Sequence, residues 1–236
     1  MKYISILLVM MLFLSGCTKM SNDFSTEISN KITEALNDKA SSPTYNHEYY
    51  FYSIEPSVGR IESTLTSNTF TYNGTKFIMN LNIPNILGTS NEDNKLSNST
   101  IYENSGEYID YNDASHQYSL YIYEVSYGKI IQLTTDYMVF YSVCSQNDAP
   151  ALVEVMLDIA KTIKIDENKI KVDYSDRELI TYKREQLELF KNITPENGAV
   201  DELFENDQIT EETETNQDGV DGDYNAPSEE DEDLNN

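Results

Sequence analysis

Apolar residues recur at spacings of three and four over residues 22–37, which is the period of an amphipathic helix. The residues that form this stripe are Phe24, Ile28, Ile32, Ala35 and Leu36. Ser21 stands where it can cap the first turn. We expect the folded domain to cover the stripe. The alternative is that the stripe binds a partner protein.

A regular alternation of residues between 118 and 127 predicts a strand with two distinct faces. One face carries Tyr118, Leu120 and Ile122, and the other carries Tyr121, Tyr123 and Val125. Asn73-Gly74 predicts a tight hairpin, because these residue types tolerate positive φ angles. Aromatic and β-branched runs predict further strands at 49–54, 61–72, 75–81, 101–109, 130–135 and 137–144. The short turns between the strands favour an antiparallel meander.

Two helices are predicted after these strands. In the first, Asp148 can cap the start and Pro150 suits the first turn. Its inward stripe is Leu152, Val155, Met156, Ile159 and Ile163, with Glu154, Asp158 and Lys161 outside. Residues 170–174 predict a short strand, and Ser175 with Glu178 forms a capping box for a helix that runs to about residue 191.

The expected fold class is therefore α+β. It is an antiparallel β-sheet meander with the N-terminal helix and two C-terminal helices packed on one face, followed by a disordered acidic tail.

The N-terminus has the order of a secretory signal: Lys2, an apolar run over 4–14, and then small residues. The run is too short for a transmembrane helix, which needs about 20 apolar residues. Its end, Leu14-Ser15-Gly16-Cys17, resembles the lipobox of bacterial lipoproteins. This resemblance implies cleavage before Cys17 and lipidation of its thiol, which would anchor the chain on the extracytoplasmic face of the cell membrane. The alternatives are an ordinary signal peptide with a chance cysteine and a short buried segment.

Charge is unevenly distributed along the chain. The formal net charge is -25, and fifteen Asp or Glu but no Lys or Arg follow residue 200. Such a segment buries too little apolar surface to fold. We expect a signal peptide at 1–16, a lipidated N-terminus with helix and linker at 17–47, an extracytoplasmic domain at 48–205 and a disordered tail at 206–236. The tail is either solvated or a site for a basic partner or divalent cations. Nucleic acid is not an expected partner, because no basic cluster is present.

The sequence contains no motif that predicts catalysis. There is no G-x-S-x-G elbow and no glycine-rich phosphate loop. His47 and His116 are too far apart in sequence to suggest zinc binding, and we expect both to be exposed. Cys144 lies in an apolar run and is expected to be a small buried side chain. We therefore predict no catalytic residue, no metal site and no cofactor.

The strand run followed by a helix ending Ile-Ala-Lys-Thr-Ile-Lys (159–164) resembles the PsbP/Mog1-like α/β domain. The chain as a whole is similar to uncharacterised lipoproteins of low-GC Gram-positive bacteria. Neither resemblance transfers a functional residue.

Three functions stay open. The first is a membrane-anchored, non-catalytic docking module with a protein partner at the membrane or cell wall. The second is recognition of a small peptide or saccharide on the tyrosine-rich sheet face, through Tyr121 and Tyr123. The third is an enzyme with residues that no motif reveals, for example Cys144 beside His116.

Overall fold

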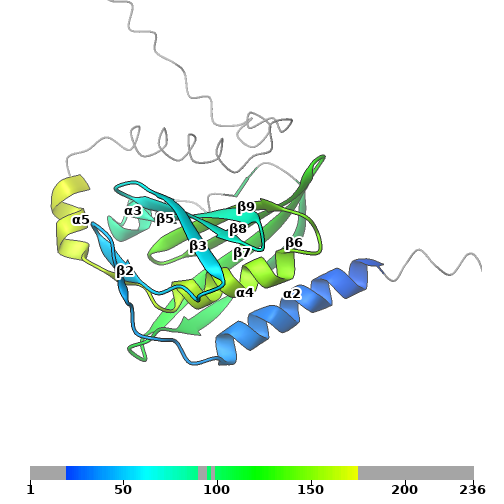
Figure 1. The fold of residues 1–236 in the computed structure, drawn as a ribbon, viewed down its shortest axis with the longest axis horizontal. Coiled ribbons are helices and arrows are strands. Elements are labelled where there is room, and N and C mark those ends of the chain that lie inside the picture. Colours follow the sequence, from blue (N-terminus) through cyan, green and yellow to red (C-terminus); the bar gives the residue numbers. More distant parts are fainter. Residues whose placement is uncertain (1–19, 90–94, 97–98, 175–236) are drawn as a thin grey trace, which may run out of the picture. The chain divides into compact units, whose positions relative to one another are not determined.

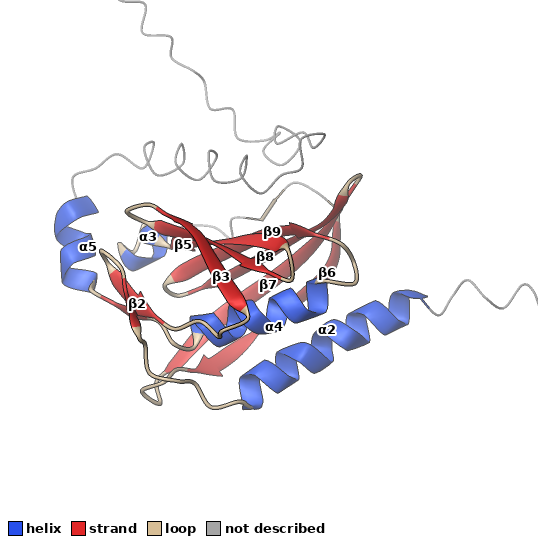
Figure 2. Cartoon of the chain, in the orientation of Figure 1, coloured by secondary structure: helices blue, strands red, loops and turns tan. Residues whose placement is uncertain are grey.

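The computed structural model describes residues 20–89, 95–96 and 99–174. They form two antiparallel sheets with an N-terminal helix and helices after the strands, which confirms the predicted α+β fold class (Figure 2). The helices are α2 (Met20–Asn37), α3 (Ile83–Ile86), α4 (Ala149–Ala160) and α5 (Glu167–Tyr174). The predicted helix from Ser175 and the predicted acidic tail lie outside the described residues.

The large sheet has seven strands in the order β3-β4-β5-β9-β8-β7-β6. These are β3 (Val58–Ser63), β4 (Ser67–Tyr72), β5 (Thr75–Leu81), β6 (Thr100–Ile109), β7 (Ser115–Val125), β8 (Gly128–Thr135) and β9 (Met138–Cys144). Two sequential runs, β3 to β5 and β6 to β9, meet where β5 pairs with β9. The last strand of the sheet in sequence is therefore a central one, and most of its side chains are buried.

The small sheet has three short strands in the order β1-β2-β10. These are β1 (Tyr45–Asn46), β2 (Tyr50–Tyr52) and β10 (Lys164–Ile165). A bond from the Ser53 amide to Thr162 Oγ1, 2.8 Å long, joins the end of β2 to the chain that follows α4. The small sheet is thus attached where α4 ends.

The two faces of the large sheet have separate cores. Tyr118, Leu120 and Ile122 belong to the core that also contains α2 and α4. Tyr121, Tyr123 and Val125 belong to a second cluster on the opposite face. This division is the one that the alternation in β7 predicts.

The predicted hairpin at Asn73-Gly74 is confirmed. Asn73 has φ 49° and Gly74 has φ 83°, and Tyr72 pairs with Thr75 across the turn. Phe70 and Phe77 face one another in the adjoining strands, with ring centroids 5.2 Å apart. The turn thus sets the register that places both rings in the core.

The predicted stripe of α2 is covered by the domain. Phe24, Ile28, Ile32 and Ala35 are buried, and α2 packs against α4 and β6 (Figure 1). The helix begins at Met20, so Ser21 lies inside it and not at its cap. None of the helices in the part of the chain that the structure describes is long and apolar enough to cross a membrane.

Helices α2 and α4 run in the same direction. Lys31 in α2 pairs with Glu154 in α4 at 3.0 Å, and the Ala35 carbonyl, further along α2, accepts a hydrogen bond from Lys161 just after α4. The first turns of both helices therefore lie at one end of the domain, where β9 ends. Their last turns lie at the other end, where the β6–β7 turn donates a 2.9 Å bond from the Tyr111 amide to the Lys161 carbonyl.

The prediction that Lys161 faces solvent is wrong. Its side chain is 2% exposed, and its ammonium donates to the Ala35 carbonyl and to Asp158 Oδ1, the latter at 3.0 Å. Ala35 is in the last turn of α2, where carbonyl groups lack partners within the helix. A cation there also interacts favourably with the helix dipole. Burial raises the pKa of Asp158, and this effect outweighs the opposing hydrogen bond from Lys161.

The predicted strand at 170–174 is also wrong, because these residues belong to α5. Ile170 and Tyr174, four residues apart, are buried, whereas Val172 between them is 76% exposed. A strand would place all three side chains on one face. The start of α5 is capped by Asp166, whose Oδ1 accepts a 3.1 Å bond from the Lys169 amide.

Other boundaries differ from the predictions. The single strand expected at 61–72 is divided into β3 and β4 by a turn at 64–66, and α3 was not predicted. Asp148 precedes α4 without a capping bond from its side chain. Its carboxylate instead accepts a 2.7 Å bond from the Ser145 hydroxyl.

We predict that Lys161→Met lowers the free energy of unfolding by about 2–3 kcal/mol, because a buried carbonyl and carboxylate lose their donor. The matched control is Lys31→Met, which removes a half-buried surface pair between the same two helices and should cost at most about 1 kcal/mol. Urea unfolding followed by circular dichroism measures both. Equal losses in the two variants would show that Lys161 has no special role.

Candidate functional site

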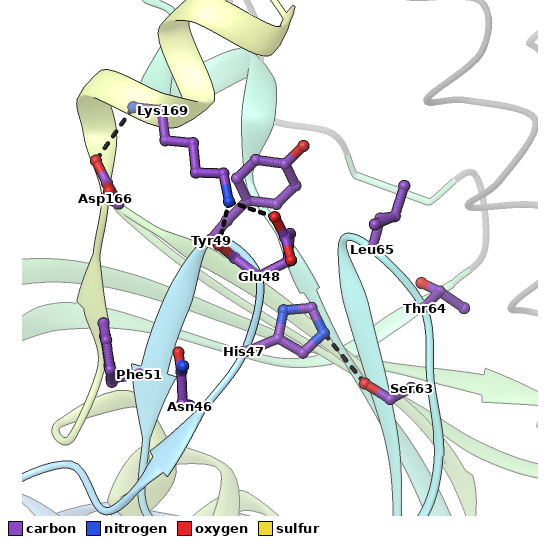
Figure 3. Close-up of a pocket in the computed structure, with 10 residues that line it drawn as sticks. All are labelled: Asn46, His47, Glu48, Tyr49, Phe51, Ser63, Thr64, Leu65, Asp166 and Lys169. Atoms are coloured by element: carbon purple, nitrogen blue, oxygen red, sulfur yellow. Dashed lines mark hydrogen bonds and ion pairs between the residues drawn. The ribbon is translucent and has the colours of Figure 1, made fainter.

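An open cavity of about 810 Å³ lies beside the small sheet (Figure 3). Its walls come from the β1–β2 hairpin, from the β3–β4 turn and from the start of α5. The lining residues are Asn46, His47, Glu48, Tyr49, Phe51, Ser63, Thr64, Leu65, Asp166 and Lys169. Because β10 and α5 follow α4 directly, the cavity lies at the end of the domain where α2 and α4 finish.

His47 is the half-buried centre of one wall. Its Nε2 lies 3.1 Å from the Ser63 hydroxyl, and its ring stacks on Tyr50 with centroids 4.2 Å apart. Its Nδ1 is buried and makes no hydrogen bond among the described residues. Burial lowers the pKa of His47, outweighing the backbone of Thr64 and the carboxylate of Glu48, which raise it. The imidazole is therefore held in its neutral form near pH 7.

The charged groups of the cavity are arranged around Lys169. Its ammonium contacts the Glu48 carboxylate and lies 5.3 Å from the centre of the Tyr49 ring. Asp166 is exposed, and one of its oxygens is used to cap α5. The lining thus carries two carboxylates and one ammonium, so its net charge is negative when His47 is neutral.

Two apolar side chains project at the cavity from different elements. Phe51 in β2 is 39% exposed, and Leu65 in the β3–β4 turn is 56% exposed. Figure 3 shows them on opposite sides of His47. The Lys164 ammonium lies 5.7 Å from the centre of the Phe51 ring. These side chains offer apolar contact area on each side of a polar floor.

The Ser63–His47 pair does not amount to a hydrolytic site. A nucleophilic serine needs a base that is itself oriented by a third group. Among the residues that the structure describes, no carboxylate bonds to His47 Nδ1, and the nearest carboxylate in sequence, Glu48, is held by Lys169. The geometry suits binding better than acyl transfer.

The structure places the predicted ligand-binding residues Tyr121 and Tyr123 together, but in buried positions. Tyr121 is 6% exposed and Tyr123 is fully buried, with ring centroids 6.3 Å apart. The Lys95 ammonium lies 4.5 Å from the Tyr121 ring centre, and the Tyr123 hydroxyl accepts a 3.2 Å bond from the Leu96 amide. Neither ring lines the cavity, and a ligand would have to displace residues 95–96 to stack on them.

The expectation that His116 is exposed is wrong. It is 9% exposed, and its two ring nitrogens lie 3.1 Å from Asp136 Oδ2 and 3.3 Å from Asp110 Oδ2. Both nitrogens can donate only in the imidazolium form. Asp110 also accepts backbone bonds from Asn112 and Ala114 and so shapes the β6–β7 turn. His116 therefore belongs to a polar network that ties this turn to the sheet.

Cys144 is buried, as predicted, and burial raises the pKa of its thiol to about 12. It lies at the end of β9 beside Lys129, whereas His116 lies at the start of β7. The two side chains are at opposite ends of the sheet and form no Cys–His pair. Cys17 lies outside the described residues. Within the described ranges, no three His, Cys, Asp or Glu residues are placed to hold a metal ion.

No pattern of neighbouring residues indicated the cavity. His47 and Ser63 are 16 residues apart, and Glu48 and Lys169 are 121 apart, so only the folded chain brings them together. One local signal was available for α5. Asp166 is a residue type that caps helices, with the Lys169 amide three residues later, and it would have indicated a helix instead of a strand at 170–174.

Comparison with protein-family models, with curated proteins and with solved structures finds no match to this chain.

We predict that His47 titrates with a midpoint below its ordinary value of 6.5, as read from its ring proton shifts by NMR. Because the folded form binds the proton less readily than the unfolded form, stability should be lost as the pH falls below about 6.5 and through the lower midpoint of the folded form. Urea unfolding at pH 7.5 and 5.5 measures this loss. The free energy of unfolding should fall less between the two pH values in His47→Gln than in the unmodified chain. A midpoint at or above 6.5 would contradict the burial of this imidazole.

Proposed function

We propose that the chain is a lipid-anchored extracytoplasmic protein whose folded domain is a non-catalytic docking module, with the cavity as its docking surface. The observation that carries this proposal is the packing of α2. A helix fixed to the domain links any anchor at Cys17 to a defined end of the molecule.

The length of chain between the anchor and the domain supports a fixed orientation. Only Thr18 and Lys19 separate Cys17 from Met20, the first residue of α2. At about 3.6 Å per residue, a lipid on Cys17 would keep the first turn of α2 within about 11 Å of the bilayer surface. Two acyl chains on one residue give stable anchoring, whereas one chain gives only weak binding.

The position of the cavity supports its role in docking. The 18 residues of α2 span about 27 Å at 1.5 Å per residue. The cavity lies beyond the last turn of α2, so the proposed anchor and the cavity are at opposite ends of the domain. A partner in the envelope would therefore meet the cavity without approaching the lipid head groups.

Recognition of a ligand by the tyrosine-rich face is the weaker candidate. The low exposure of Tyr121 and Tyr123 leaves no open ring for stacking. Catalysis has less support still, because no carboxylate of the described ranges orients the Ser63–His47 pair.

We predict that bacterial cells expressing the full chain incorporate radioactive palmitate into it and that Cys17→Ser abolishes the label. Cys144→Ala is the matched control, because its thiol is buried and should carry no lipid. Gel autoradiography of membrane fractions measures the label. Label that persists in Cys17→Ser, or its absence from the unmodified chain, would contradict lipid anchoring.

Docking at the cavity makes a second prediction. A photocrosslinking amino acid placed at Leu65 should give a discrete crosslinked product in intact cells. The same amino acid at Ile109 is the control, because this side chain is 50% exposed on the edge strand β6. Immunoblotting of the two variants measures the products. Identical patterns at both positions, or no product at Leu65, would contradict docking at this surface.

A further inference from the structure

We propose that the cavity binds a basic peptide segment of its partner, with apolar side chains against Phe51 and Leu65 and a cationic side chain beside Asp166. This inference rests on the proposed docking function of the cavity, and it does not depend on lipid anchoring. It names the chemistry of the partner from the charge and exposure of the lining residues.

The electrostatics of the lining favour a cation. Lys169 is the one ammonium group among the described lining residues, and Glu48 holds it. Asp166 is exposed, and its capping bond to the Lys169 amide uses one of its two oxygens. An incoming ammonium or guanidinium therefore has a carboxylate oxygen available, whereas the one ammonium of the lining already contacts a carboxylate. The Lys164 ammonium lies over the Phe51 ring but does not belong to the lining.

The charge of the whole chain acts in the same direction. With a formal net charge of -25, the protein attracts basic segments over a distance of several ångströms and repels acidic ones. Attraction of this kind affects the association rate and the specificity for a partner more than it affects the final affinity. The close contacts must therefore come from the cavity itself.

The apolar contacts distinguish a peptide from a simple cation. Phe51 and Leu65 are partly exposed on two different elements, and they face the cavity from either side of His47 (Figure 3). Covering such side chains removes apolar area from water, which favours association. The exposed Asn46 amide also lines the cavity and can bond to peptide groups.

Binding can be measured with the full chain purified in a neutral detergent. The probe is a fluorescein-labelled peptide, Gly-Lys-Leu-Gly-Lys-Leu-Gly, followed by fluorescence anisotropy. The comparison peptides replace both lysines by glutamate or both leucines by serine. We expect saturable binding of the first peptide, binding that weakens as salt screens the charges, and little binding of the other two.

Variants then locate the site. Asp166→Asn keeps an oxygen for the helix cap but removes the charge, and it should raise the dissociation constant about threefold. Leu65→Ser should raise it about fivefold through lost apolar contact. Lys169→Gln should lower it, because the cavity then becomes more negative.

The matched controls are Glu27→Gln, which removes an exposed charge on α2, and Ile109→Ser, which removes an exposed apolar side chain on β6. Both should bind as the unmodified chain does, and circular dichroism checks that every variant is folded. Equal effects of Glu27→Gln and Asp166→Asn would overturn the inference, since binding would then follow net charge alone.

Further outcomes distinguish a failure of basic-peptide binding from a failure of docking at the cavity. If crosslinks form at Leu65 but the basic peptide does not bind, the partner has a different chemistry and only the inference fails. Displacement of the labelled peptide by a neutral trisaccharide such as chitotriose would assign the cavity to saccharides and also overturn it. If neither crosslinks nor peptide binding occur, both proposals fail.

Discussion

The packing of α2 against α4 is the constraint on which the rest of the arrangement depends. Lys161 completes it, because its buried ammonium joins the last turn of α2 to the end of α4. A buried cation is costly unless it is paired and hydrogen-bonded. Here the Ala35 carbonyl and the Asp158 carboxylate meet both requirements, so the observed register of the two helices satisfies the buried cation.

This register gives the domain two different ends. The first turns of α2 and α4 share one end with the final residues of β9. The other end collects the short strands, the β6–β7 turn and α5. Tyr111 and Thr162 connect these pieces to the helix pair through backbone and hydroxyl bonds. Binding surfaces are often made by such short connecting elements when a rigid scaffold holds them in place.

Local patterns in the sequence predicted the elements that are determined by residues close together in the chain. The α2 stripe, the two faces of β7 and the Asn73-Gly74 hairpin depend on residues close together in the chain. The predictions failed where a distant group changes the outcome. Lys161 is buried because α2, more than 100 residues earlier, supplies a carbonyl, and His116 is buried between carboxylates from two turns.

The run at 170–174 failed for a different reason. Its apolar residues alternate as in a strand, yet Asp166 upstream begins a helix that exposes Val172. The cavity could not be predicted at all, since the described residues that line it come from three separate stretches of sequence. None of those stretches carries a motif, because binding needs only complementary shape and charge.

Helix α2 is fixed to the domain and is not an independent stalk. Hydrogen–deuterium exchange of the full chain, read by mass spectrometry at peptide resolution, tests this directly. We expect amides of residues 28–36 to exchange as slowly as those of β8 and β9, because they open only when the shared core opens. Exchange of residues 28–36 within seconds, while β8 and β9 stay protected, would contradict it.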